Sequence, residues 1–263
     1  MDSKPLISVI TVCYNVADEL KSTMISVLKQ GYNNIEYIVI DGGSSDGSVG
    51  VIESYDKPIT DLGGRLKWIS ERDTGIYDAM NKGLDLSTGD WVIFMNAGDS
   101  FASETILTEV FSIARLSDIV FGKSITRYKD LSAIRYEDFE TNNEYWYNSK
   151  MPNHQAIFIN KSLYQSHRYD LAYKVCADTV FLRSLFDLAS SIDEVEFPIC
   201  NFELGGKSNF YGDFSTFKSC VYDSVRIHKT TLRPLLMHCI KYFSQLVLGK
   251  HIYLMLYIKL LYK

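Results

Sequence analysis

The stretch LISVITV, residues 6–12, decides the fold class of this 263-residue chain. It is a short apolar run rich in β-branched residues, which is typical of a strand buried on both faces of a sheet. Asp18 and Glu19 follow it, and apolar residues then recur at helical spacing up to residue 28. Acidic side chains favour a first helical turn. The sequence therefore predicts a strand, a loop and a helix, with Asn15 as the helix cap.

The same strand and helix unit repeats along the first 100 residues. Further strands are predicted at residues 35–40, 66–70 and 90–95, and helices at residues 49–52 and 75–84. This alternation predicts an α/β fold with a mostly parallel central sheet and helices on both faces. Ligands of such sheets bind at the carboxyl ends of the strands. The polar residues that directly follow each strand therefore form the candidate site.

Polar side chains follow all four predicted strands. They are Thr11, Tyr14 and Asn15 after the first strand, Asp41 after the second, Glu71, Arg72 and Asp73 after the third, and Asn96 and Asp99 after the fourth. Asn81 and Lys82, on the helix after the third strand, are predicted to point toward the same rim. Several carboxylates at one rim repel one another unless a cation lies between them. We therefore predict a positively charged ligand at this rim.

The loop after the first strand argues against two classes of nucleotide-binding enzyme. Residues 13–15, CYN, contain none of the glycines of the dinucleotide-binding motif, and no Walker A lysine motif occurs in the chain. A dehydrogenase is therefore not favoured, and a bound diphosphate would need a metal ion to neutralise it. The loop also lacks the glycine-rich, basic sequence that a sugar nucleotidyltransferase would place there.

The second half of the chain is less regular. Strands are predicted near residues 119–121, 156–159 and 194–202, and a helix over residues 179–188. Residues 136–148, YEDFETNNEYWYN, are typical of a loop or lid. Its aromatic side chains either stack on a sugar or pack against the protein, and both alternatives remain open.

Four motifs in order resemble glycosyltransferase family 2 on a GT-A fold, particularly its bacterial polysaccharide-assembly branch. They are ISVITVCYN (7–15), EYIVIDGGSSDGS (36–48), SERDTGIYDAMNKGL (70–84) and GDWVIFMNAGD (89–99). NHQAIFI, CADTVFLRSLF and NFELGGKSN extend the resemblance to residue 209. We therefore expect one GT-A domain over residues 1–215, with a nucleotide-sugar-binding half over 1–100 and an acceptor-binding half over 101–215.

The resemblance implies an inverting transfer of a sugar from a nucleotide-diphosphate donor to a saccharide or lipid-linked saccharide in surface polysaccharide biosynthesis. Tyr14 would stack on the base, and Asp41 would accept the imide hydrogen of a uracil-type base, which favours a UDP-sugar. Asp73 and Arg72 would close the base and ribose side. Thr11 sits one residue earlier than the corresponding hydroxyl of some relatives. Asn15, Asn81, Lys82 and Asn96 complete the donor-binding set.

Asp99 is the predicted metal ligand. Mn²⁺ and Mg²⁺ prefer oxygen ligands and need only one or two protein carboxylates when phosphates and waters complete the shell. The motif of many relatives is Asp-x-Asp-Asp, whereas residues 96–99 read NAGD and keep only the last acid. Asn96 would bond to the ribose or to a metal-bound water. The alternative is a simple turn in which Asp99 caps a helix that begins near Ser103.

Asp178 is the predicted catalytic base, because an acceptor hydroxyl must lose its proton as it attacks. It lies at the start of a predicted helix, at the place where the family has its base. His154, in NHQ, is the alternative base or an acceptor-orienting residue. A non-catalytic sugar-nucleotide-binding or scaffolding subunit remains the second interpretation, because the acidic motif is depleted.

Residues 216–263 are predicted to form an amphipathic helical tail. From Ser224 onward the chain carries seven basic residues and no acidic one, although the whole chain has a net charge of -5. Lysines interrupt every apolar window long enough to span a bilayer. We predict a segment that lies on an anionic membrane surface. The alternative is a helix docked on the protein's own core or in a homo-oligomer interface.

The cysteines and the N-terminus predict a cytoplasmic location. The five cysteines include no C-x-x-C pair, which favours reduced thiols. The first residues show no basic region and no cleavage site typical of a signal peptide. With the basic tail, this predicts a peripheral protein on the cytosolic face of the inner membrane, and we expect no nucleic-acid partner.

Overall fold

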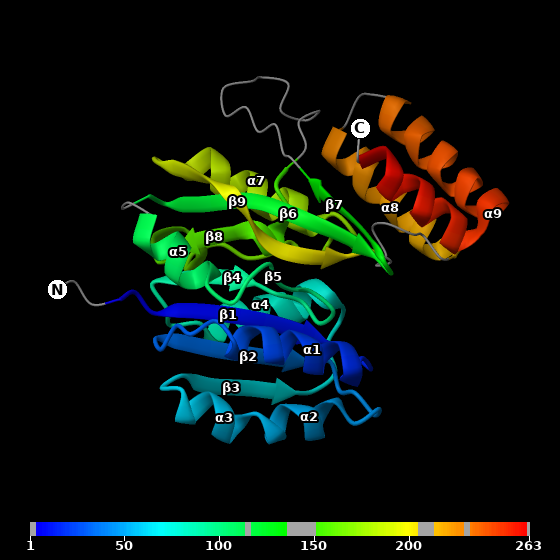
Figure 1. Cartoon of the computed structure of the whole chain (residues 1–263). Helices are drawn as coiled ribbons and strands as arrows, with labels where there is room; N and C mark the ends of the chain where they lie inside the picture. Colours follow the sequence, from blue (N-terminus) through cyan, green and yellow to red (C-terminus); the bar gives the residue numbers. More distant parts are fainter. Residues whose placement is uncertain (1–3, 114–116, 136–150, 205–212, 229–231, 262–263) are drawn as a thin grey trace.

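A single sheet of nine strands runs through the computed structural model, which describes residues 4–113, 117–135, 151–204, 213–228 and 232–261 (Figure 1). Its order is β3-β2-β1-β4-β8-β6-β9-β5, with β7 paired to β6. The strands are β1 (Ile7–Cys13), β2 (Ile35–Asp41), β3 (Arg65–Ser70), β4 (Trp91–Phe94), β5 (Ser100–Phe101), β6 (Ile119–Tyr128), β7 (Leu131–Arg135), β8 (Ile157–Asn160) and β9 (Ile192–Glu203). The predicted aromatic lid and the glycine loop after Leu204 lie outside the described residues.

The four strands predicted in the first half are confirmed and are parallel to one another. Beyond β4 the sheet is mixed, because β8 is antiparallel to both β4 and β6, while β6 and β9 are parallel. The carboxyl ends of β1, β2, β3 and β4 therefore meet at one edge, as the α/β pattern indicates.

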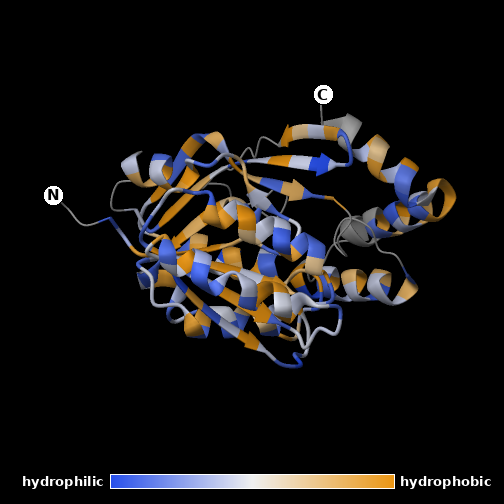
Figure 2. Ribbon diagram, turned by 60° about the horizontal axis from the view of Figure 1, so that its bottom comes forward, coloured by the Kyte–Doolittle hydropathy of each residue, from blue (hydrophilic) through white to orange (hydrophobic). Residues whose placement is uncertain are grey.

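Helices cover both faces of the sheet. One face carries α1 (Ala17–Leu28), α2 (Ser48–Ser54), α3 (Asp56–Asp61) and α5 (Ile106–Ile113), and the other carries α4 (Ile76–Leu86), α6 (Lys161–Tyr164) and α7 (Ala177–Leu188). Within β1, Ile7 and Val9 point to the first face while Ile10 and Val12 point to the second. Both faces of β1 are buried, so apolar side chains project from both sides of the strand. Apolar segments, orange in Figure 2, accordingly run through the strands.

The first helix is capped differently from the prediction. Asn15 has a left-handed backbone (φ 52°), and its side chain accepts a hydrogen bond from the amide of Ser45, 2.9 Å away. The first amide of α1, at Ala17, instead donates to the Asp46 carboxylate at 2.9 Å. The cap prediction for Asn15 was therefore wrong, because the acceptor for the helix end comes from the loop after β2. Asn15 joins that loop to β1.

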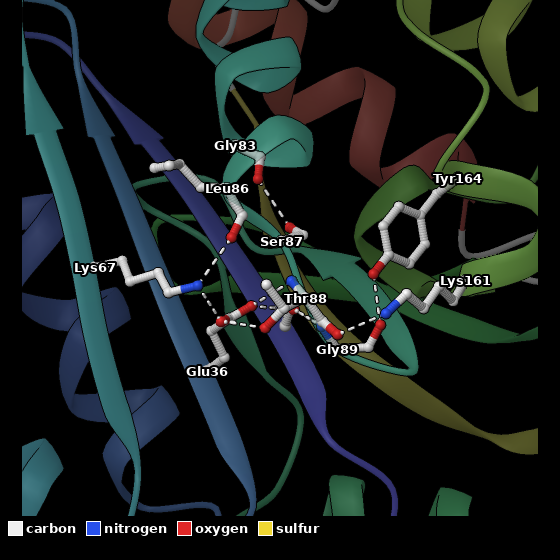
Figure 3. A network of polar contacts seen from close by, with 10 residues as sticks. Glu36, Lys67, Gly83, Leu86, Ser87, Thr88, Gly89, Lys161 and Tyr164 are labelled. Carbon is white, nitrogen blue, oxygen red and sulfur yellow. Dashed lines mark hydrogen bonds and ion pairs between the residues drawn. The ribbon is translucent and has the colours of Figure 1, made fainter.

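A buried carboxylate holds the amino-terminal end of the sheet, opposite the candidate site (Figure 3). Glu36 in β2 has no exposed surface and accepts from the Lys67 ammonium at 2.5 Å, the Ser8 hydroxyl at 2.7 Å and the Thr88 amide at 2.8 Å. Burial acts to raise the pKa of Glu36, but these hydrogen bonds outweigh it and leave the pKa below its usual value. Glu36 thus ties three strands to the loop that leads into β4.

We expect Glu36→Ala to lower the free energy of unfolding by about 3 kcal/mol at pH 7, because it leaves Lys67, Ser8 and Thr88 without their acceptor. The pKa of Glu36 is lowered in the folded state, so its stabilisation is complete above the unfolded pKa and disappears as the pH falls through the folded pKa. Urea unfolding followed by circular dichroism should show the difference at pH 7 and a smaller one in acid. Lys29→Met, which removes the exposed Lys29–Glu104 pair, is the control and should cost less than about 1 kcal/mol. If wild type and Glu36→Ala differed in free energy of unfolding by the same amount at every pH, Glu36 would not have a lowered pKa in the folded state.

The C-terminal tail folds as two helices against the far edge of the sheet. They are α8 (Phe214–His228) and α9 (Leu232–Leu261), and α9 is broken at Gly249, which has a left-handed φ of 71°. The second part of α9 packs on β7 and β6, where Leu254 is fully buried against Tyr128 and Ala133. The alternative of docking on the protein's own core thus holds for this part of the tail (Figure 1). Within the described residues no helix has the length and apolarity needed to cross a bilayer.

Candidate active site

Three strand ends come together around Gly42. A Cβ atom at Gly42 would lie 2.7 Å from Asp73 Oδ2 and 3.3 Å from the ring of Tyr14. Any larger residue would therefore displace a predicted donor-binding side chain. Tyr14 is 62% exposed beside the partly exposed Asp73, and Arg72 is exposed next to it. This part of the rim offers an aromatic surface, a carboxylate and a guanidinium to a ligand.

Asp41 lies inside the rim and has no exposed surface. Its carboxylate accepts from the amide of Ser44 at 2.9 Å, the hydroxyl of Ser70 at 2.6 Å, the amide of Gly43 at 3.2 Å and the hydroxyl of Ser44. Burial acts to raise the pKa of Asp41, but these donors hold the pKa below its usual value. A carboxylate has about four lone-pair sites, so the protein already occupies them. In this structure Asp41 organises the loop that follows β2.

Lys82 lies behind the rim and supports the loop after β3. Its ammonium is 2.7 Å from a carboxylate oxygen of Glu71 and 3.4 Å from the carbonyl oxygen of Arg72. The hydrogen bond to Glu71 is the main cause that raises the pKa of Lys82. Asp78 accepts from the amide and hydroxyl of Thr74 instead of pairing with Lys82.

Two predicted donor-binding residues do not reach the rim. Thr11 is fully buried in β1, and its hydroxyl bonds to the Tyr37 hydroxyl at 2.9 Å and the Met95 carbonyl at 2.7 Å. The Asn81 side chain bonds to both the carbonyl and the amide of Tyr169, at 3.0 and 2.8 Å. The polar atoms of both side chains are thus engaged with neighbouring strands and loops in this structure.

Asp99 ends a tight turn that buries its carboxylate. The side chain is 6% exposed, and it accepts from Gln155 Nε2 at 2.7 Å and from the amide of Glu203 at 3.0 Å. Burial raises the pKa of Asp99 to about 7, against the lowering effect of these two hydrogen bonds. Gly98 has a left-handed φ of 101°, which suits glycine. The helix-cap alternative was wrong, because α5 begins at Ile106 and the carboxylate binds elsewhere.

Asp178 lies in the first turn of α7 and is 30% exposed. Its Oδ1 accepts from the amide of Thr179 at 2.8 Å and from the Tyr77 hydroxyl at 3.3 Å, and its Oδ2 is 3.7 Å from His154 Nδ1. His154 Nε2 is 3.1 Å from the side-chain nitrogen Nδ2 of Asn96. Burial lowers the pKa of His154, although the charge of Asp178 acts in the opposite direction. His154 is therefore the neutral partner of an accessible carboxylate.

The adjacent residues His154 and Gln155 connect the two acids. They belong to a short 3-10 turn (His154–Ala156), from which one side chain reaches Asp178 and the next reaches Asp99. Gln155 and Tyr77 were not predicted as site residues. The signal for Gln155 was present in the motif NHQ, where a second polar residue precedes an apolar strand.

The comparison with known families decides the class of protein. The family model described as Glycosyl transferase family 2 matches residues 8–188, which is more than half of the chain. The chain belongs to glycosyltransferase family 2. Its match spans β1 through α7 and so includes both Asp99 and Asp178.

Curated relatives of this family 2 glycosyltransferase cover most of its length. It is 31% identical over 219 residues to a PGL/p-HBAD biosynthesis glycosyltransferase of Mycobacterium bovis (strain BCG / Pasteur 1173P2), across 78% of this chain and 80% of that one. It is 32% identical over 187 residues to an uncharacterized glycosyltransferase of Mycobacterium tuberculosis, across 69% of each chain. Both relatives are described as glycosyltransferases.

Solved structures share its fold. S. aureus TarS in complex with UDP-GlcNAc superposes with a TM-score of 0.66 at 16% identity, over 91% of this chain and 73% of that one. The mannosyltransferase PcManGT from Pyrobaculum calidifontis, in complex with GDP-Man and Mn2+, superposes with a TM-score of 0.65 at 14% identity, over 98% and 80% of the two chains. The family 2 glycosyltransferase therefore has the predicted GT-A fold.

The residues around Asp99 fit a divalent cation that is shared with a ligand. The described part of the chain contains no group of three or more histidine, cysteine, aspartate or glutamate side chains that could enclose a metal by itself. However, Asn96 Oδ1 and Gln155 Oε1 are buried oxygens without a hydrogen-bond partner among the described residues. Such oxygens suit Mg²⁺ or Mn²⁺, which takes its remaining ligands from phosphate and water. Asp99 would supply the charged ligand.

Proposed function

We propose that this protein is an inverting, metal-dependent glycosyltransferase that transfers a sugar from a UDP-sugar to a hydroxyl of a saccharide or lipid-linked saccharide in surface polysaccharide biosynthesis. The observation that carries the proposal is the linkage of Asp99 and Asp178 through one short turn at the carboxyl edge of the sheet. The ligands bound in two structural neighbours, UDP-GlcNAc and GDP-Man, support a nucleotide-sugar donor.

The exposed rim is the proposed donor site. Tyr14 offers its ring to the base, while Asp73 and Arg72 lie on the ribose side. Asp41 acts indirectly, because it fixes the loop that places Gly42 between Tyr14 and Asp73. Asn15 holds the same loop from the side of β1. This division lets the nucleotide bind to exposed groups while buried groups keep the rim in shape.

The transfer step uses the two acids on opposite sides of the reacting carbon. A cation on Asp99 would stabilise the charge that develops on the diphosphate as it leaves. Asp178 accepts the proton of the attacking hydroxyl, so that the new carbon–oxygen bond forms while the bond to the diphosphate breaks. Tyr77 and the amide of Thr179 orient one oxygen of Asp178 and leave the other toward His154. His154 is the proposed acceptor-orienting group.

A donor screen tests this function. Thermal unfolding should be measured with UDP-, GDP- and dTDP-sugars, each with and without Mn²⁺. A ligand at 100 times its dissociation constant stabilises the folded state by about 2.7 kcal/mol, so the true donor class should raise the Tm clearly. We expect the largest shift with a UDP-sugar and Mn²⁺. Absence of any nucleotide-dependent shift would contradict the proposal.

The tail is the proposed membrane contact, on the cytosolic face of the inner membrane. The first part of α9 exposes an apolar stripe at intervals of three or four residues, which places its members on one face. They are Leu236, Ile240, Phe243 and Val247, with exposed fractions of 60%, 52%, 62% and 83%. The tail from residue 224 onward has seven basic residues and no acidic one. An apolar stripe on a cationic segment fits an anionic bilayer.

Replacement of Ile240 and Phe243 by serine should lower co-sedimentation with anionic vesicles by on the order of tenfold, because each side chain contributes apolar area to the bilayer contact. Leu62→Ser, at a 55% exposed leucine outside the tail, is the matched control and should leave binding unchanged. Light scattering should show the same molecular mass for all variants. Unchanged vesicle binding with a reduced mass would instead assign the stripe to a homo-oligomer interface.

A further inference from the structure

The segment that leads into the base-bearing helix is held by the C-terminal tail. Asp223, on α8, has no exposed surface, and its Oδ2 accepts from the amides of Lys174, Val175 and Cys176 at 2.9, 2.7 and 3.1 Å. These three residues directly precede α7, which begins at Ala177. One buried carboxylate from the tail therefore binds three successive backbone amides at the entrance to α7.

Two further side chains complete the attachment of this segment. Arg226, one turn along α8 from Asp223, donates to the carbonyl of Ala172 at 3.3 Å, and its guanidinium lies 4.8 Å from the ring centroid of Tyr173. From the opposite side, the Tyr77 hydroxyl donates to the carbonyl of Val175 at 2.5 Å and lies 3.3 Å from Asp178 Oδ1. The segment is therefore fixed between α4 and α8.

The arrangement constrains Asp178 through the backbone. Successive amides that converge on one anion define the backbone dihedral angles of the residues that carry them. A buried carboxylate without such donors would be costly, so the contact strongly favours this one conformation. Asp178 follows the last of the three residues by two positions. A change in the backbone of residues 174–176 would therefore move the carboxylate of Asp178, which is proposed to accept the proton.

We propose that Asp223 is a positioning residue for Asp178 and couples the tail helices to the transfer step. The inference rests on the proposed function of Asp178 as the base. Asp223 acts through the backbone of residues 174–176 and touches neither donor nor acceptor. The neighbouring Ser224 bonds to α9 instead, with its hydroxyl 2.9 Å from His238 Nε2.

Three variants test the proposal with kinetics. Asp223→Ala should lower kcat by up to about 100-fold, since a displacement of about 1 Å at a reacting group can have that effect, while the KM for the donor stays within twofold. Asp223→Asn should have a smaller effect, because the amide oxygen still accepts. Ser224→Ala is the matched control. It removes the bond to α9 from the neighbouring residue without touching residues 174–176, and its kcat should stay within twofold of wild type.

Amide hydrogen exchange gives a second readout that does not depend on activity. The amides of residues 174–176 should exchange faster in Asp223→Ala, and to a lesser degree in Asp223→Asn, and should be unchanged in Ser224→Ala. Unchanged exchange of these amides in Asp223→Ala, or an equal loss of kcat in Asp223→Ala and Ser224→Ala, would overturn the proposal. If wild-type protein transfers no sugar from any donor, the proposed function fails. The exchange data would still show whether Asp223 holds the backbone of residues 174–176.

Discussion

We expect Asp178→Asn to lower the rate of sugar transfer by about 10²- to 10⁴-fold, the usual contribution of a general base, and to leave the affinity for the donor unchanged. The substitution keeps the size of the side chain, and its carbonyl oxygen can still accept from the Thr179 amide and the Tyr77 hydroxyl. What disappears is the capacity to take up the acceptor proton. Donor binding should survive because Tyr14 and Asp73, and not Asp178, are the proposed contacts to the base and the ribose.

The measurement combines a radiolabelled transfer assay with calorimetric titration of the donor. Asp187→Asn is the matched control, because Asp187 is an exposed carboxylate on the same helix and should be replaceable without effect. If Asp178→Asn transfers sugar at the wild-type rate, the base is a different residue. If wild type binds the donor and transfers nothing, the chain is the non-catalytic sugar-nucleotide-binding subunit that the depleted acidic motif also suggests.

The second large effect concerns Asp99→Asn, which should abolish the dependence of donor binding on Mn²⁺ and lower transfer by at least about 100-fold. The variant replaces the charged oxygen of the site by a neutral amide, while the fold keeps an acceptor for the Glu203 amide. Because Asn96 supplies only a neutral oxygen, no second carboxylate of the turn can compensate. The dependence of donor binding on Mn²⁺ should therefore be almost completely lost in Asp99→Asn.

Calorimetric titration of the UDP-sugar with and without Mn²⁺ checks this result for wild type and variant. Glu104→Gln is the control, since Glu104 is an exposed acid paired only with the surface residue Lys29 in the described contacts. Equal donor affinity of wild type in the presence and absence of the metal would remove Asp99 from its role.

The sequence was sufficient to predict the first half of the fold, because strands buried on both faces carry continuous apolar runs. The parallel order of β1 to β4 and the convergence of their ends followed from that pattern. In the mixed second half, β6, β8 and β9 were predicted, whereas β5, which has only two residues, and β7 were not. Short strands carry little periodicity, and their pairing depends on contacts far apart in the chain.

The site was predictable in outline and less so in its individual contacts. Side chains alternate between the two faces of β1, so Thr11 lies on the same buried face as Ile7 and Val9. Asn81 and Gln155 find their partners 88 and 56 residues away, at separations that no local pattern encodes. The same limit applies to Asp46, which replaced Asn15 at the start of α1.

The turn that carries His154 and Gln155 also limits which length changes the chain can accept. One peptide unit separates the side chain that reaches Asp178 from the side chain that reaches Asp99. An inserted or deleted residue would rotate one of the two away from its acid, whereas substitutions of similar shape would preserve both distances. Among homologous chains, we therefore expect substitutions in this turn to be tolerated more often than insertions or deletions.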